Sequence, residues 1–335
     1  MVTMNDVAKK SGFSVATVSA VINNSPVVSP KSREKILEAI NDLGYRPNAI
    51  ARSLKNAKTS SIGVIVRDIT NPYYPEIVSG LEEVAWENNY EVFLCNTENS
   101  SEREEKYINN LLEKRVDGVV IATSLKERKH YYNKLNIFGI PYVFLNRRPD
   151  ELYDHECFIG ANNRLAAIKV VDHIKQMGYS EIAFLSGPQE FSTFRDRLMG
   201  FHEGMDKNRL NVEQKWTKSA DSYSKQRGYE EAKKMIHYGS LPEIIFCSSD
   251  LMAFGVYLAL QEKGLRIPEE IALISIDNNM FSDLIDLSSV NMQNKEMGKE
   301  AASMLMSLLK DESMENQRFL LEPELVIRKS SGASV

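Results

Sequence analysis

The chain has 335 residues and a mass of 38.0 kDa, more than one compact core usually holds, so we expect two or three domains. Its composition, 43% hydrophobic and 26% charged, excludes a disordered or fibrous chain. No apolar run reaches the roughly 18 residues of a membrane helix, and the opening MVTMNDVAKK lacks the apolar stretch of a secretory signal. Three widely spaced cysteines, Cys95, Cys157 and Cys247, are interpreted as reduced core residues of a cytoplasmic protein with no membrane partner.

Charge is distributed unevenly along the chain. Residues 1–60 carry a net charge of +5, so the remaining residues carry −10. A small basic segment ahead of a large acidic body is typical of a nucleic-acid reader attached to a sensing or catalytic domain.

The basic segment has the spacing of short helices. Thr3 and Asp6 have the separation of a capping box, and Gly12 provides a helix end. Ser14 is a second N-cap, and the apolar residues after it recur at helical spacing: Val18, Val21 and Ile22. This pattern predicts a helix-turn-helix, although a generic helical hairpin has the same spacing.

A third helix is predicted to begin at Ser29-Pro30, a cap followed by proline at the first helical position, and to end at Gly44. Its expected buried stripe consists of Ile36, Leu37, Ile40 and Leu43. Three such helices can bury one small core together.

The amino-acid sequence of this segment is typical of one protein family. It reads DVAKKSGFSVATVSAVIN and then VSPKSREKILEAINDLGYRPNAIARSL, which closely resembles the LacI/GalR family of bacterial transcriptional regulators. The match covers the first 60 residues almost without a gap, and a weaker resemblance continues through the chain. It implies a helix-turn-helix DNA-binding domain over residues 1–47, a hinge helix and linker over residues 48–60, and an effector-binding core of two lobes.

The resemblance implies that the second helix lies in the major groove. Val15, Ala16 and Ala20 would then face base edges. Many family members have arginine where this chain has Ala20, and short apolar side chains can contact only thymine methyl groups. We therefore expect weak direct readout from this helix, while a packing role for Ala20 stays open. Further DNA-binding candidates that contact phosphates or position the helices are Thr3, Ser14, Thr17, Ser19, Asn23, Arg33 and Tyr45.

The hinge segment NAIARSLK, residues 48–55, has a helical composition but is too short to be a stable helix alone. In the family, two such segments pair in the minor groove and wedge a leucine from each between base pairs. Leu54 occupies that place, with Arg52 and Lys55 beside it, in a phrase most similar to a purine-responsive member of the family. The alternative is a linker leucine with no role in DNA binding.

The body alternates β-branched apolar runs with amphipathic stretches such as residues 76–89 and 102–114. This pattern predicts βαβ units, and therefore an α/β fold with parallel, doubly wound sheets like those of periplasmic binding proteins. The first series of predicted strands is SIGVIV, YEVFLCN, DGVVIA and YVFLN, and the second is CFIG, EIAFLSG, EIIFCSS and IALISID. We expect an N-terminal lobe over residues 61–158 and 289–321, and a C-terminal lobe over residues 159–288 and 322–331.

Enzyme signatures are missing from the sequence. RDITNPYY, rather than a GxGxxG cradle, follows the first predicted strand. We find no phosphate loop ending in GK[ST], no HExxH pair and no GxSxG elbow. The body is therefore interpreted as a binding module without enzymatic activity, metal or cofactor.

Ligands of such sheets bind at the carboxyl ends of the strands, which here means the cleft between the lobes. Asn162 stands where many relatives have aspartate, and Phe191 where the purine-responsive member has arginine, so purine binding is not expected. Arg197 and Asp277 are the strongest candidates, because a cleft that binds polyols needs a donor fork and a carboxylate acceptor. The effector-binding candidates are Asp68, Asn71, Tyr73, Tyr74, Asn146, Arg147, Asn162, Phe191, Arg197, Tyr223, Ser249 and Asp277.

Structural roles for these residues stay open. Arg197 and Asp277 could each form an interlobe salt bridge, and the aromatic side chains could pack rather than stack on a sugar. Trp86 falls off the apolar stripe of its predicted helix, so it is either a partner contact or simply exposed.

We predict a homodimeric repressor that binds pseudo-palindromic double-stranded operator DNA under the control of a small effector, expected to be a sugar or sugar derivative. The effector could either release DNA or tighten its binding. The alternatives are a catabolite-type regulator whose corepressor is a phosphorylated partner protein, and a solute-binding receptor without a regulatory role.

Overall fold

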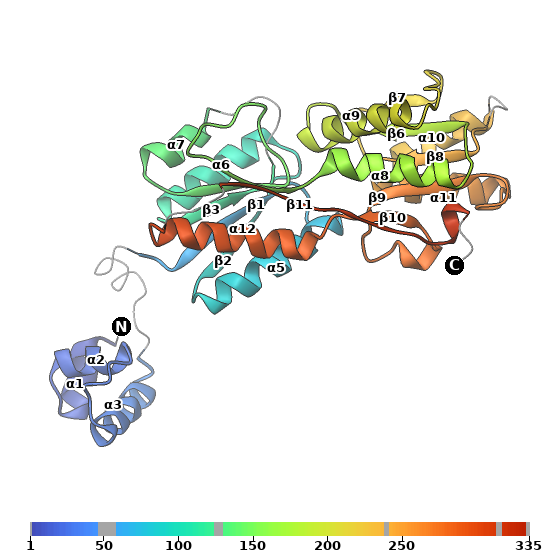
Figure 1. Ribbon diagram of the computed structural model, residues 1–335. Helices are drawn as coiled ribbons and strands as arrows, with labels where there is room; N and C mark the ends of the chain where they lie inside the picture. The colour runs from blue at the N-terminus through green and yellow to red at the C-terminus, as the bar shows by residue number, and fades with distance from the viewer. Residues whose placement is uncertain (1, 46–57, 124–129, 238–240, 313–316, 333–335) are drawn as a thin grey trace. The chain divides into compact units, whose positions relative to one another are not determined.

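The computed structural model describes residues 2–45, 58–123, 130–237, 241–312 and 317–332. The chain divides into two compact units, Met1–Thr59 and Ser60–Val335, which we call the head and the core (Figure 1). Each is described by itself.

Three helices make up the described part of the head: α1 (Met4–Ser11), α2 (Val15–Ile22) and α3 (Pro30–Leu43). The predicted capping box is present, because the Thr3 backbone N–H donates to Asp6 Oδ2 at 2.9 Å and the Asp6 N–H donates to Thr3 Oγ1 at 3.4 Å. Gly12 ends α1 with a positive φ of 75°, a conformation that glycine adopts without strain. The predicted helix-turn-helix and third helix are therefore confirmed.

The hydrophobic interior of the head consists of Val7, Ala8, Val18, Val21, Ile36, Ala39 and Tyr45. The expectation that Leu37 belongs to the buried stripe is wrong, since its side chain is 45% exposed. Leu37 follows Ile36 by one position, which turns it about 100° around the helix, away from the interior. Ala39 is buried instead, beside Ile36 in the interior of the head.

The core contains two six-stranded sheets, one in each lobe. All strands of the first sheet are parallel. Its order is β11 (Arg318–Leu321), β5 (Cys157–Ala161), β4 (Tyr142–Leu145), β3 (Gly118–Ile121), β1 (Ser61–Val66) and β2 (Glu91–Asn96). Helices α5 (Tyr73–Glu87) and α12 (Asn294–Leu309) pack on one face, and α6 (Ser101–Glu113) and α7 (Tyr132–Ile137) on the other (Figure 1).

The second sheet is parallel except for its edge strand β12, which pairs antiparallel with β10. Its order is β12 (Glu324–Val326), β10 (Ser288–Asn291), β9 (Ala272–Asp277), β8 (Ile244–Cys247), β6 (Ile182–Ser186) and β7 (Thr217–Ser219). Helices α8 (Asn163–Gln176) and α9 (Ser192–Lys207) cover one face, and α10 (Lys225–His237) and α11 (Asp250–Lys263) the other. Two 3-10 turns, η1 (Asp283–Ile285) and η2 (Lys329–Ser331), complete this lobe.

All eight predicted strands are present, but one belongs to the other lobe. CFIG was expected to open the second series, whereas β5 pairs with β4 in the first sheet. Likewise β10, part of which was assigned to the N-terminal lobe, pairs with β9 in the second sheet. The chain therefore crosses between lobes after Ala161 and Asn291, a few residues later than the expected bounds, because strand pairing rather than hydrophobicity decides to which sheet a run belongs.

Helices α5 and α12 lie in close contact through glycine. A Cβ atom on Gly80 would lie 1.9 Å from the Lys295 carbonyl oxygen, and one on Gly298 would lie 2.0 Å from that of Ile77. The backbones approach so closely only because neither residue has a side chain. This contact holds the start of α5, which carries Tyr73 and Tyr74, against the first sheet.

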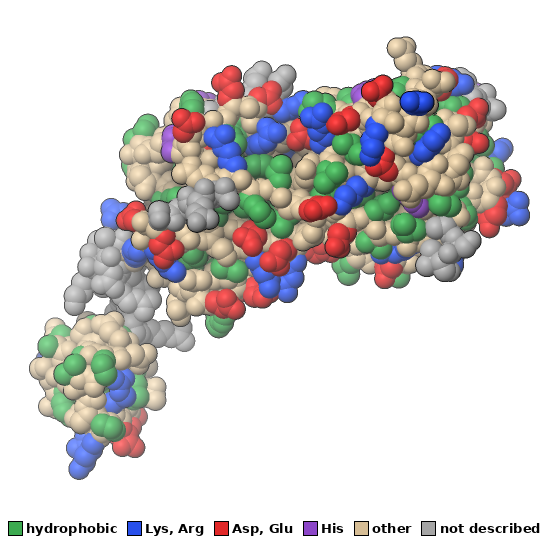
Figure 2. All heavy atoms as spheres, viewed as in Figure 1, with side chains coloured by type: hydrophobic (Ala, Val, Ile, Leu, Met, Phe, Trp, Pro, Cys, Tyr) green, Lys and Arg blue, Asp and Glu red, His purple; other side chains and the backbone are tan. Residues whose placement is uncertain are grey.

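The three cysteines are buried and free, as expected. No helix within the described residues is long and apolar enough to cross a membrane. On the face of the core seen in Figure 2, acidic and basic side chains are interspersed rather than gathered into one patch of a single sign.

Candidate functional site

The start of α2 exposes two of the three predicted base-facing residues to solvent. Val15 is 41% exposed, Ala16 is exposed, and Ala20 is half-buried. Ser14 caps the helix by accepting a hydrogen bond from the Thr17 N–H at 3.2 Å. The head therefore offers a small, apolar surface at the helix start, as the sequence predicts.

Other DNA-binding candidates have contacts inside the head. The Arg33 guanidinium donates to the Ser25 carbonyl oxygen at 2.6 Å and to Asn24 Oδ1 at 3.3 Å, so it anchors the loop between α2 and α3. Asn23 Nδ2 donates to the Ser19 carbonyl oxygen at 2.9 Å, and Tyr45 is buried in the head core. Their part in DNA binding stays a prediction. The hinge candidates Arg52, Leu54 and Lys55 lie outside the described residues.

In the core, polar side chains from both lobes meet at the carboxyl ends of the strands. They enclose a cavity of about 20 Å³, roughly the room that one water molecule needs. The predicted residues that line it are Asn71, Tyr73, Tyr74, Asn146, Arg147, Arg197, Tyr223, Ser249 and Asp277. The structure thus brings together nine of the twelve predicted effector-binding residues.

Arg197 and Asp277 form an ion pair within the C-terminal lobe, with 3.0 Å between Arg197 Nη2 and Asp277 Oδ1. The remaining guanidinium nitrogens donate to Asn163 Oδ1 at 2.7 Å and to the Ser248 carbonyl oxygen. Burial raises the pKa of the Asp277 carboxyl to about 7, even though Arg197 favours its charged form. The suggestion that these two residues bridge the lobes is wrong, since α9, β8 and β9 all belong to one lobe.

Two cleft residues have backbone conformations that side chains rarely adopt. Asn146, directly after β4, has a φ of 61°, and Asp277, at the end of β9, has a φ of 127°. The Asn146 side chain accepts a hydrogen bond from the Tyr73 hydroxyl at 2.8 Å. Strained backbone of this kind clusters at binding sites, where the surrounding structure holds it.

Contacts across the cleft hold the lobes together. Arg147 Nη2 donates to the Tyr223 hydroxyl oxygen at 3.3 Å, and the Arg148 N–H donates to Ser192 Oγ at 3.2 Å. Arg195 also pairs with Asp150. The cleft is therefore closed in this structure.

Three predicted residues do not line the central cavity. Asp68 accepts hydrogen bonds from the Thr70 N–H and hydroxyl. Asn162 caps α8 by accepting from the Leu165 N–H at 3.0 Å. Phe191 lines a neighbouring cavity instead. The first two side chains are occupied by local hydrogen bonds, which short polar residues make readily at turns and helix starts.

Both parts of the chain match known families. Residues 3–48 match the family described as bacterial regulatory proteins, lacI family, and residues 59–328 match the periplasmic binding proteins and sugar binding domain of LacI family. The chain belongs to the LacI family. It is thus a DNA-binding transcriptional regulator with an effector-binding core.

Relatives of this LacI family chain match over its length. The HTH-type transcriptional repressor PurR of Pasteurella multocida is 34% identical over 98% of both chains, and that of Photobacterium profundum is 33% identical over 98% of both. Among solved structures, the Lac repressor dimer bound to operator and the anti-inducer ONPF is 27% identical, with a TM-score of 0.86 over 99% of both chains. The transcriptional regulator CelR–cellobiose complex is 25% identical, with a TM-score of 0.74 over 98% of this chain and 100% of CelR.

Sequence reasoning missed several residues of the cleft in this LacI family member. Thr193 and Phe194 also line the central cavity from the start of α9. Asp250 lies behind it, fully buried, and its carboxylate accepts from the hydroxyls of Ser275, Ser282 and Ser289 at 2.5–2.6 Å. The available signal was the position of Asp250 directly after the strand run EIIFCSS, which makes it the first residue of α11.

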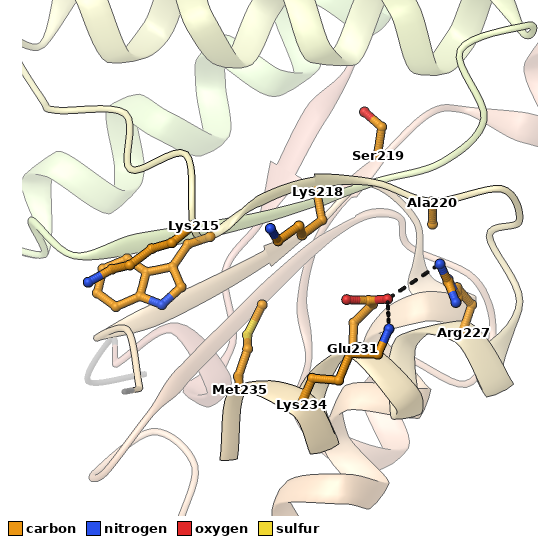
Figure 3. Close-up of a pocket in the computed structure, with 9 residues that line it drawn as sticks. Lys215, Lys218, Ser219, Ala220, Arg227, Glu231, Lys234 and Met235 are labelled. Carbon is orange, nitrogen blue, oxygen red and sulfur yellow. Dashed lines mark hydrogen bonds and ion pairs between the residues drawn. The ribbon is translucent and has the colours of Figure 1, made fainter. Parts of the chain in front are cut away.

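A larger cavity of about 570 Å³ lies beside β7 and α10, away from the predicted residues (Figure 3). Glu231 pairs there with Lys234 at 2.8 Å and with Arg227 at 3.5 Å. Lys215 Nζ lies 4.1 Å from the centre of the Trp216 ring. None of the predicted effector-binding residues lines this cavity, so its size alone does not make it the effector site.

Proposed function

We propose that this protein is a cytoplasmic transcriptional repressor that binds operator DNA as a twofold dimer and changes its affinity when a small effector occupies the core cleft. The observation that carries the DNA-binding part is the helix-turn-helix whose second helix, α2, exposes Val15 and Ala16 at its start. A single head offers little contact area, whereas a twofold dimer reads two half-sites. The Lac repressor dimer bound to operator supports this assembly by analogy.

Apolar side chains on α5 and β2 support dimerisation through the N-terminal lobe. Trp86 is 76% exposed, and Phe93 and Leu94 on the edge strand β2 are also exposed. An edge strand with exposed apolar side chains tends to be covered by a partner. We place the dimer contact at this edge of the N-terminal lobe, formed by α5 and β2.

The convergence of strand ends in the cleft supports effector control. Closure of two lobes around a ligand would shift the lobes at the dimer contact and alter the spacing of the hinge segments. We infer a binding protein rather than an enzyme, because the relatives that match its full length are named as transcriptional repressors.

The direct test is binding to inverted-repeat DNA. The wild-type protein should prefer a selected inverted repeat to scrambled duplex in a mobility-shift assay. Affinity should fall on the order of 10³-fold between about 50 and 200 mM salt, because each phosphate contact releases counterions. Equal binding to both duplexes, or a flat response to salt, would contradict the proposal.

Leu54→Ala should weaken operator binding at least about tenfold while leaving binding to random duplex nearly unchanged, because only a bent specific site accepts a wedge between base pairs. Val27→Ala is a matched control, since Val27 is an exposed apolar residue in the head outside the hinge. Titration of both duplexes with each variant measures the ratio. Equal losses on both duplexes would remove the wedge role from Leu54.

A further inference from the structure

Two arginines at the cleft have no acidic partner among the described residues. Arg67 directly follows β1, and Arg147 follows β4 by two positions. Arg147 is only 3% exposed, and the Nε and Nη1 atoms of both side chains are buried without a hydrogen-bond partner in the described part of the chain. A buried guanidinium left in this state costs free energy, which a bound anion would offset.

The two arginines are packed against the same aromatic rings of the opposite lobe. The Cζ atoms of Arg67 and Arg147 lie 4.1 Å and 3.9 Å from the centre of the Phe191 ring, and 4.8 Å and 5.6 Å from that of Tyr223. Burial, together with the charge of Arg147, lowers the pKa of Arg67. Aromatic faces offset only part of the cost of burying a cation, and neither guanidinium forms an ion pair with a carboxylate among the described residues.

The Asp277 carboxylate does not supply the missing charge, because it is engaged by Arg197. Two glutamates, Glu104 and Glu190, line the neighbouring cavity together with Arg67. Glu190 is exposed at the neighbouring cavity. Glu104 is buried and accepts a hydrogen bond from the Tyr132 hydroxyl at 2.6 Å. Neither forms an ion pair with Arg67 within the described residues.

Arg67 and Phe191 also line the neighbouring cavity, which holds about 210 Å³. Thr123, which is 5% exposed, lines it with a buried hydroxyl that has no partner among the described residues. Ser100 and Ser101, at the start of the 13-residue helix α6, line the same cavity. A helix N-terminus, an arginine fork and an unpaired hydroxyl together favour an anion.

We propose that the effector is an anion whose phosphate or carboxylate group binds Arg67, Thr123 and the start of α6, with Arg147 contributing charge from the adjoining central cavity. The neutral polar part of the effector reaches Arg197 and Asp277 once the lobes move apart, because the central cavity of about 20 Å³ has room for little more than one water molecule in this closed form. This proposal rests on the proposed function and narrows its effector class. The anion binds the arginines that link the N-terminal lobe to Phe191 and Tyr223, so its binding is coupled to how far the cleft is open.

The test is thermal unfolding of the full-length protein with inorganic phosphate, glucose 6-phosphate, gluconate or glucose, at equal concentration and ionic strength. The anions should raise the melting temperature, whereas glucose should not, because a ligand stabilises only the state that binds it. Phosphate and gluconate distinguish a phosphate ester from a carboxylate. Arg67→Gln and Thr123→Val should lower affinity for the stabilising anion at least about tenfold, the loss that corresponds to one charge-assisted hydrogen bond.

Arg164→Gln is the matched control, because Arg164 is an exposed arginine of the same core that pairs with Glu203. It should keep the full anion shift. Without ligand, Arg67→Gln should not lower the melting temperature. If Arg67 served only to hold the lobes together through its contact with Phe191, the same substitution would lower it.

No stabilisation by any anion, or equal stabilisation of the Arg67→Gln variant, would overturn the anion site. The wild-type sample is also titrated with the inverted repeat. If it binds that DNA but shows no anion shift, the proposed function stands and this proposal fails. If it shows no preference for the repeat, the proposed function itself fails.

Discussion

Asp277→Ala should abolish the effector response while operator binding in the absence of effector persists. Asp277 is the buried acceptor of the cleft, and it pairs with Arg197 at 3.0 Å. Its loss removes an acceptor for ligand hydroxyls and releases the guanidinium that α9 brings into the site. The measurement is operator affinity with and without the stabilising ligand. An unchanged response would show that the effector does not contact this residue.

Removing the carboxylate also leaves Arg197 buried and unpaired, which itself costs about 3–5 kcal/mol. Asp277→Asn is therefore the companion variant, because the amide oxygen can still accept from Arg197. Since the pKa of Asp277 is raised to about 7, acidification from pH 8 to pH 6 protonates the wild-type side chain and should weaken effector binding. In Asp277→Asn the affinity for a carboxylate probe such as gluconate, which does not titrate between pH 8 and pH 6, should already be weak and nearly independent of pH.

Asp250→Ala should lower the free energy of unfolding of the core by about 3–5 kcal/mol, because a carboxylate that accepts several buried hydrogen bonds leaves its donors unpaired when it is removed. Besides the three serine hydroxyls, the Asn279 N–H donates to it at 2.8 Å. These bonds connect the start of α11 to β9, β10 and the loop after Asp277. We expect the effector response to be lost as well, since this loop positions Asp277.

Asp250→Asn is the control for this prediction. Its amide oxygen can still accept, and serine hydroxyls can rotate to accept from the amide nitrogen, so the loss should be about 1 kcal/mol. Urea unfolding followed by tryptophan fluorescence measures the difference, because Trp216 is buried in the same lobe whereas Trp86 is exposed. A loss below about 1 kcal/mol for Asp250→Ala would show that the serine hydroxyls find other partners.

Local signals predicted most of the secondary structure. Caps such as Thr3 and Gly12 act within one helical turn, so the order of residues is enough to locate them. The eight apolar runs became strands because β-branched residues between turn signals favour that conformation. Leu37 was misplaced because helical periodicity defines a face only approximately.

The candidate site was predicted to a large extent, because the carboxyl ends of parallel strands meet at one edge in any doubly wound fold. This rule brought Asn71, Asn146 and Asp277 to one cavity. It could not show that Asp68 and Asn162 turn to local hydrogen bonds, or that Asp250 holds the loop behind the cleft. Those outcomes depend on side-chain partners far apart in the chain.

By itself, the sequence determined the helix-turn-helix, the alternation of strands and helices, and membership of a regulator family. These follow from the spacing of apolar and capping residues over short stretches and from short sequence motifs. Only the tertiary structure decided that the whole of β5 belongs to the N-terminal lobe and the whole of β10 to the C-terminal lobe, whereas the expected bounds divide both strands. It also decided that Arg197 pairs within its own lobe, and that Arg67 and Arg147 contact Phe191 without an acidic partner among the described residues. The physical reason is that strand pairing and charge compensation are long-range properties. They depend on which segments the folded core places within a few ångströms of each other.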